Sequence, residues 1–63
     1  MSNLKHIRTE YGITQGQLAV KSHVNLRTIR AYEQGYRDIN KATYETLKAL
    51  ARALCCEIED LLE

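Results

Sequence analysis

The chain has 63 residues, of which 44% are hydrophobic and 27% are charged, and it contains no Pro, Trp or Phe. A chain this short is expected to fold as one domain, residues 1–63, and it leaves little room for a large ligand cavity. The net charge of +1 conceals a polarity, because residues 1–52 hold all nine Lys and Arg against four acids, whereas residues 53–63 hold four acids and no base. An anionic partner would therefore bind the first part of the chain.

The first predicted helix covers Asn3–Tyr11 and ends at Gly12, which suits the left-handed conformation that closes a helix. Its apolar side chains recur at helical spacing: Leu4, Ile7 and Tyr11. The same spacing places Arg8 on this face, and it places Glu33 on the apolar face of a later helix. Because an unpaired buried charge is costly, we predict an ion pair between Arg8 and Glu33. The alternative is that both side chains extend to solvent at the rim.

Two short helices joined by a tight turn are predicted within Thr14–Gly35. Thr14 is followed three residues later by Gln17, which is the spacing of a capping box, so a helix begins at Thr14. This helix runs to about Ser22, and Asn25 then caps the next one.

The helix over residues 25–34 has two faces of different character. Around Ile29 the predicted inner face holds Leu26, Tyr32 and Glu33. The opposite face holds two cations, a small side chain and an amide: Arg27, Arg30, Ala31 and Gln34. Such groups suit the base edges and phosphates of a DNA major groove.

The remaining segments complete an all-α fold of five helices. Residues 35–40 form a loop, and Asn40 is predicted to cap a fourth helix over Lys41–Leu54. The predicted buried face of that helix is Thr43, Leu47, Leu50, Ala51 and Leu54. A short fifth helix is predicted over Glu57–Leu62, with acids in its first turn that suit the helix dipole.

Several classes of function are disfavoured by what the chain contains. No motif sets a nucleophile beside a base, so an enzyme is not expected. The four potential metal ligands His6, His23, Cys55 and Cys56 lack ligand spacing, and no metal, other cofactor or small-molecule ligand is expected. The adjacent cysteines are expected to be free thiols in a reducing compartment. Without a signal peptide or an apolar run of spanning length, no membrane association and a cytoplasmic location are expected.

The order and spacing of these segments resemble the Cro/C1-type (XRE-like) helix-turn-helix DNA-binding domain of bacterial and phage repressors. The resemblance covers nearly the whole chain, through LKHIRTEYGITQGQLA, VNLRTIRAYEQG, ETLKALARAL and a closing EDLL. It implies a compact, lambda-repressor-like fold in which the second and third helices form the helix-turn-helix. It also implies a repressor-like transcriptional regulator that binds double-stranded DNA.

The resemblance assigns roles to particular positions. It implies that Gln15 binds a phosphate. The residues that would face the bases are Leu26, Arg27, Arg30 and Ala31. The residues that would meet the DNA backbone are Asn25, Gln34, Tyr36, Arg37 and Lys41. His23 stands where the family usually has Gly, and Cys55 stands where Gly or Asn is usual, so a left-handed backbone is expected at His23.

Three of these roles have alternatives. Arg27 is predicted to read a guanine, whereas Arg30 suits a phosphate as well as a base. Leu26 could touch a thymine methyl group or pack beneath the helix. A homodimer on a two-fold DNA site is expected, with Ile58, Leu61 and Leu62 as its surface, unless these three side chains merely cover the core. The competing function is a protein-interaction module on the same scaffold, such as an antirepressor or an antitoxin-like partner.

Overall fold

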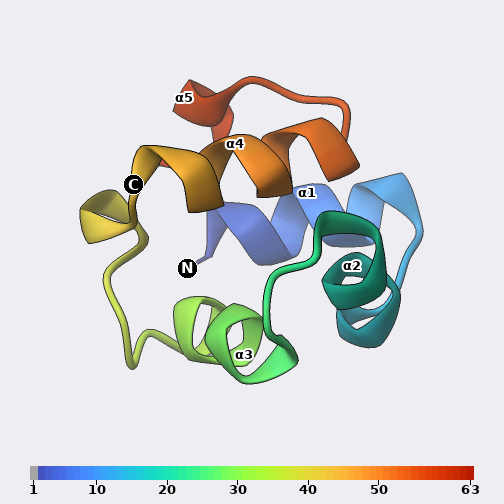
Figure 1. Ribbon diagram of the computed structural model, residues 1–63, viewed down its shortest axis with the longest axis horizontal. Helices are drawn as coiled ribbons and strands as arrows, with labels where there is room; N and C mark the ends of the chain where they lie inside the picture. Colours follow the sequence, from blue (N-terminus) through green and yellow to red (C-terminus); the bar gives the residue numbers. More distant parts are fainter. Residues whose placement is uncertain (1) are drawn as a thin grey trace.

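The computed structural model describes residues 2–63 and is all-helical over that range (Figure 1). The α-helices are α1 (Asn3–Tyr11), α2 (Gln15–Ser22), α3 (Leu26–Gln34), α4 (Tyr44–Ala53) and α5 (Ile58–Leu61), and a short 3-10 helix, η1 (Ile39–Lys41), precedes α4. The prediction of an all-α fold with five helices is confirmed. None of the helices described has the length and apolar character needed to cross a membrane.

Side-chain caps fix where the helices of the helix-turn-helix begin. Thr14 Oγ1 accepts from the Gln17 backbone N–H at 3.0 Å, and Gln17 Oε1 accepts from the Thr14 N–H at 2.8 Å, so the predicted capping box is present. Asn25 Oδ1 accepts from the Arg27 N–H at 2.7 Å and begins α3. Each of these bonds satisfies an N–H group that the first turn of a helix would leave without a partner.

The core is built by every α-helix. Five side chains are fully buried, one from each: Leu4, Leu18, Ile29, Leu50 and Leu61. They hold α2 against α3 and α4, and α1 against α3 and α5. Burying one such side chain stabilises a fold by about 1.5–3 kcal/mol. The short α5 is therefore part of the core rather than an appendage.

The predicted start of the fourth helix was wrong. The α4 helix begins at Tyr44, and its cap is Thr43, whose Oγ1 accepts from the Thr46 N–H at 3.2 Å. The preceding turn is instead capped by Asp38, which accepts from the Asn40 N–H at 2.9 Å. Thr43 is consequently exposed, whereas the other four residues predicted for the buried face are buried: Leu47, Leu50, Ala51 and Leu54.

Asn40 has a different role from the predicted cap. Its Nδ2 donates to the Glu63 carbonyl at 2.5 Å, and its Oδ1 accepts from the Glu63 N–H at 2.8 Å. From the other side, Asn3 Nδ2 donates to the Leu62 carbonyl at 2.7 Å. The segment after α5 is thus fixed between the start of α1 and η1.

Two non-glycine residues end helices or turns in the left-handed region. His23 follows α2 with a φ of 62°, as its position in the turn predicted, and Cys55 follows α4 with a φ of 55°. Glycine fills the equivalent positions after α1 and α3, where Gly12 has a φ of 88° and Gly35 a φ of 84°. A side chain at a positive φ is strained, so His23 and Cys55 occupy these positions at some cost in stability.

Candidate nucleic-acid interface

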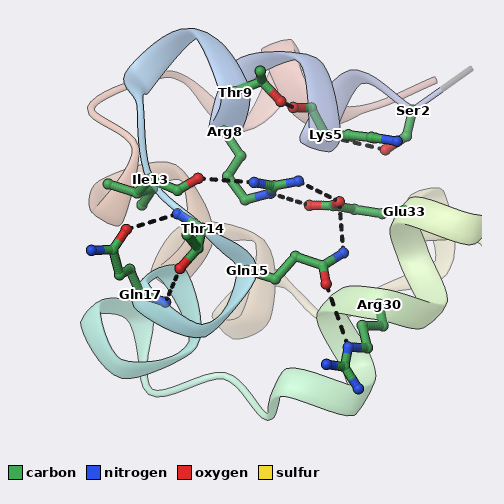
Figure 2. Close-up of polar contacts among 10 residues, drawn as sticks. All are labelled: Ser2, Lys5, Arg8, Thr9, Ile13, Thr14, Gln15, Gln17, Arg30 and Glu33. Atoms are coloured by element: carbon green, nitrogen blue, oxygen red, sulfur yellow. Dashed lines mark hydrogen bonds and ion pairs between the residues drawn. The ribbon is translucent and has the colours of Figure 1, made fainter.

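A buried ion pair joins α1 to α3 beneath the candidate interface (Figure 2). Arg8 Nε donates to Glu33 Oε2 at 2.7 Å, and Arg8 Nη2 donates to Glu33 Oε1 at 3.0 Å. The side chain of Arg8 is 13% exposed and that of Glu33 is 1% exposed, so the two do not extend to solvent. The predicted ion pair is confirmed, in the bidentate geometry that guanidinium and carboxylate groups favour.

Arg8 also fixes the turn that leads into α2. Its Nη1 donates to the carbonyl of Ile13 at 2.8 Å, directly before the capping box. The hydrogen bond to Glu33 and the charge of that carboxylate raise the pKa of Arg8 above its ordinary value, and they outweigh the opposite effect of burial. The guanidinium therefore stays charged and holds α1, the α2 entry and α3 in one arrangement.

The predicted outer face of α3 is accessible in the folded chain. Arg27, Arg30 and Gln34 are exposed there, and Ala31 is half-buried between them. In Figure 1, α3 lies at the lower edge of the molecule, and α1 and α4 lie above it. The predicted grouping of two cations, an amide and a small side chain on one accessible surface therefore holds in the folded chain.

Gln15, predicted to bind a phosphate, has partners within the protein. Its Nε2 donates to Glu33 Oε1 at 2.9 Å, and its Oε1 accepts from Arg30 Nε at 3.4 Å. The side chain is half-buried at the start of α2. Helical phase indicated that Glu33 faces inward, but it contains no information on which α2 residue would reach the second oxygen of that carboxylate.

The start of α3 presents Asn25 and Leu26. The carboxamide oxygen of Asn25 accepts the cap hydrogen bond, and its amide group makes no hydrogen bond within residues 2–63. Leu26 is half-buried. This degree of exposure does not decide between its two predicted roles, contact with a thymine methyl group and packing beneath the helix.

The segment after α3 continues the exposed polar surface. The N–H groups of Tyr36 and Arg37 both donate to the Ala31 carbonyl, at 2.9 and 3.2 Å, which turns the chain back at the end of the helix. Tyr36 is 81% exposed. The Arg37 guanidinium lies 5.4 Å from the ring centre of Tyr32, and Lys41 is exposed in η1. These three exposed side chains follow α3 in the chain.

The proposed dimer residues are mostly committed to the core. Leu61 is fully buried, and Ile58 and Leu62 are half-buried and pack against the core. Leu61 therefore has no exposed surface with which to contact a second copy. For this residue the structure supports the alternative prediction, that the side chain covers the core. Only the exposed parts of Ile58 and Leu62 remain for contact with a partner.

The two cysteines differ in environment. Both are free thiols, with Cys55 exposed and Cys56 half-buried. Burial raises the pKa of the Cys56 thiol, and the nearby carboxylates of Asp60 and Glu57 raise it further. Cys56 therefore resists conversion to the reactive thiolate.

Comparison with known proteins gives one result. The sequence profile of a family described as helix-turn-helix matches residues 4–61, which span all five α-helices. Searches of curated proteins and of solved structures found no match to the chain.

Proposed function

Because the chain belongs to the helix-turn-helix family, of the Cro/C1 type, we propose that it is a sequence-specific regulator of transcription, repressor-like, whose α3 enters the DNA major groove. The family supports a DNA-binding domain. The observation that carries the finer proposal is the outer face of α3, on which Arg27 and Arg30 are exposed while Ile29 of the same helix is fully buried. Two cations on an accessible helix face suit an anionic groove.

Arg27 is the residue that we assign to base reading. It lies in the first turn of α3, on the face of the helix opposite the fully buried Ile29. A guanidinium in this position suits bidentate bonds to O6 and N7 of a guanine. Ala31, one turn along the same face, is small enough to let the helix approach the bases closely.

The exposed polar residues at the end of α3 and after it are assigned to the DNA backbone. Gln34, Tyr36, Arg37 and Lys41 lie at the C-terminal end of α3 and beyond it, and all four are exposed. The amide group of Asn25 would meet the backbone at the other end of the helix. Contacts of this kind set the position of the protein on the duplex, whereas base contacts select the sequence.

Pairing of two copies on a two-fold site is part of the proposal. A single module of this size covers only about 600–1,000 Å² on DNA, and the net charge of +1 gives weak general attraction. With Leu61 buried, the surface available for pairing is the exposed side of α4 together with the outer parts of Ile58 and Leu62. The two free thiols suit a reducing compartment that contains DNA, such as a prokaryotic cytoplasm.

The test is selection of bound sequences from a pool of random duplexes, followed by titration of the selected duplex over a range of salt concentrations. We expect one enriched sequence, repeated as two half-sites about 10 base pairs apart, and an affinity that falls steeply with salt. No enrichment, together with an affinity that ignores salt or no affinity at all, would contradict the proposal and favour a protein-interaction module.

A further inference from the structure

The Gln15 carboxamide lies between two groups of opposite charge, as Figure 2 shows. Its nitrogen donates to the Glu33 carboxylate, and its oxygen accepts from the Arg30 guanidinium. A carboxylate only accepts hydrogen bonds and a guanidinium only donates them. Both neighbours therefore require the same orientation of the amide, with the nitrogen toward Glu33 and the oxygen toward Arg30.

The inner end of this chain of contacts is the Glu33 carboxylate, which is held by several hydrogen bonds. The side chain of Glu33 is 1% exposed, and both of its carboxylate oxygens accept from Arg8. The second oxygen also accepts from Gln15, so the amide is anchored to the buried ion pair. The oxygen atom of Gln15 is directed toward Arg30, and an acceptor in that place would repel phosphate oxygens.

The outer end of the chain is a cation in a defined position. Arg30 is exposed, and its two terminal nitrogens point away from Gln15 in Figure 2. Neither nitrogen has a hydrogen-bond partner within residues 2–63. At about 100° per residue, Arg30 lies about 60° around α3 from Arg27, toward the α2 side of the outer face. Arg30 therefore lies at the edge of the outer face, beside α2. If α3 enters the groove as proposed, a guanidinium at that edge meets the side of the groove, where the backbone phosphates lie, rather than its floor.

From this geometry we infer that Arg30 binds a backbone phosphate and does not read a base, and that Gln15 is a positioning residue that orients Arg30 from the buried carboxylate. The inference rests on the proposed function. It assigns to Arg30 the phosphate contact that the family resemblance gives to Gln15. The two arginines of α3 then have different roles, because Arg27 contacts a base and Arg30 contacts the DNA backbone.

The test is a double-mutant cycle of Arg30→Ala and Gln15→Met, measured on the selected duplex, on its single-base-pair variants and on a scrambled duplex. Arg30→Ala should weaken binding to all of these by the same factor and reduce the magnitude of the salt slope by about 1. Gln15→Met should also reduce the slope, because Arg30 then loses its orientation. Added to Arg30→Ala, Gln15→Met should have no further effect.

Two outcomes would overturn the inference while leaving the proposed function intact. Loss of preference at one base pair in Arg30→Ala would make Arg30 a reader. Additive losses from the two substitutions would mean that Gln15 binds DNA by itself. If the unmodified protein shows no salt-dependent affinity for any duplex, the proposed function fails first.

A measurement on the unmodified protein avoids any effect of substitution on folding. The side-chain amide protons of Gln15 should give a signal protected from solvent exchange before DNA is added. That signal should change little when the selected duplex binds, since its partner is Glu33. Rapid exchange in the free protein, or a large shift on binding, would contradict the orientation inferred.

Discussion

Arg27 is the side chain on which sequence recognition is expected to depend most. Replacing it with Ala should cost about 1–3 kcal/mol of binding free energy on the selected duplex and relax the preference at one base pair. The loss should be much smaller on a scrambled duplex. Lys5→Ala is the matched control, because it removes the same charge from an exposed site on α1, which has no assigned contact with DNA or with a second copy. Equal losses for Arg27→Ala on both duplexes would refute the base-reading role.

The Arg8 to Glu33 ion pair should dominate stability among the polar contacts. Arg8→Met leaves the Glu33 carboxylate, which is 1% exposed, without a cation, and this should lower the free energy of unfolding by about 3–5 kcal/mol. For a chain of this size such a loss is a large part of the whole, since domains have about 0.05–0.15 kcal/mol of stability per residue.

Urea unfolding of Arg8→Met and of the double variant Arg8→Met/Glu33→Leu measures this effect. The double variant should recover much of the lost stability, because it has no buried charge without a partner. Unchanged stability in the single variant would mean that both groups are solvated in solution.

Cys56 should make stability fall at alkaline pH. Its pKa is raised in the folded chain above the ordinary value of 9.0, so the folded state holds the proton more tightly than the unfolded state does. The resulting stabilisation is complete below pH 9 and is lost as the pH rises above it. Unfolding measured from pH 8 to 11 should show a smaller decline for Cys56→Ala than for the unmodified protein or Cys55→Ala. The same decline in all three proteins would exclude this contribution.

The contacts of the Gln15 side chain could not be predicted from the helical phase of single residues. The inward direction of Glu33 and its pairing with Arg8 followed from helical phase and from the cost of a lone buried charge. The contacts of Gln15 with Glu33 and Arg30 depend on how α2 and α3 are packed, and no periodicity within either helix contains that information.

Among the helices, those with strong end signals were predicted closely. The Thr14 and Gln17 capping box and the glycine after Tyr11 fixed the ends of α1 and α2. The start of α4 was missed because three successive candidates compete there. Asp38 caps the 3-10 turn, Asn40 bonds to Glu63, and Thr43 is left to begin the helix. The choice depends on the position of the segment after α5, which is a tertiary contact.

The turn between α2 and α3 contains a residue, His23, whose replacement should increase stability. His23 has a φ of 62°, a conformation that glycine adopts without strain. His23→Gly should raise the free energy of unfolding by up to about 1 kcal/mol and increase the melting temperature. His23→Ala is the control, since it removes the imidazole and keeps the strain. An equal increase in both variants would place the cost in the histidine side chain instead of the backbone.

The molecule as a whole separates its charges and its functions. All the cations lie within residues 1–52, and four of them, Arg27, Arg30, Arg37 and Lys41, are in α3 or in the segment that follows it. The acids of residues 53–63 belong to the segment that closes the core through Leu61. A sequence can reveal this polarity, and the fold adds that the two regions are carried by different helices. The burial of Leu61 could not be predicted from the sequence, since an apolar side chain on a short terminal helix suits a core or a partner equally well.

The most direct test of the central claim is to map the DNA-binding surface by NMR. Backbone amide signals would be followed while the selected duplex is added to the protein labelled with ¹⁵N. We expect the largest changes in residues 25–37, with smaller changes at Lys41 and at the start of α2. Changes confined to α4 and α5, with α3 unaffected, would contradict the account.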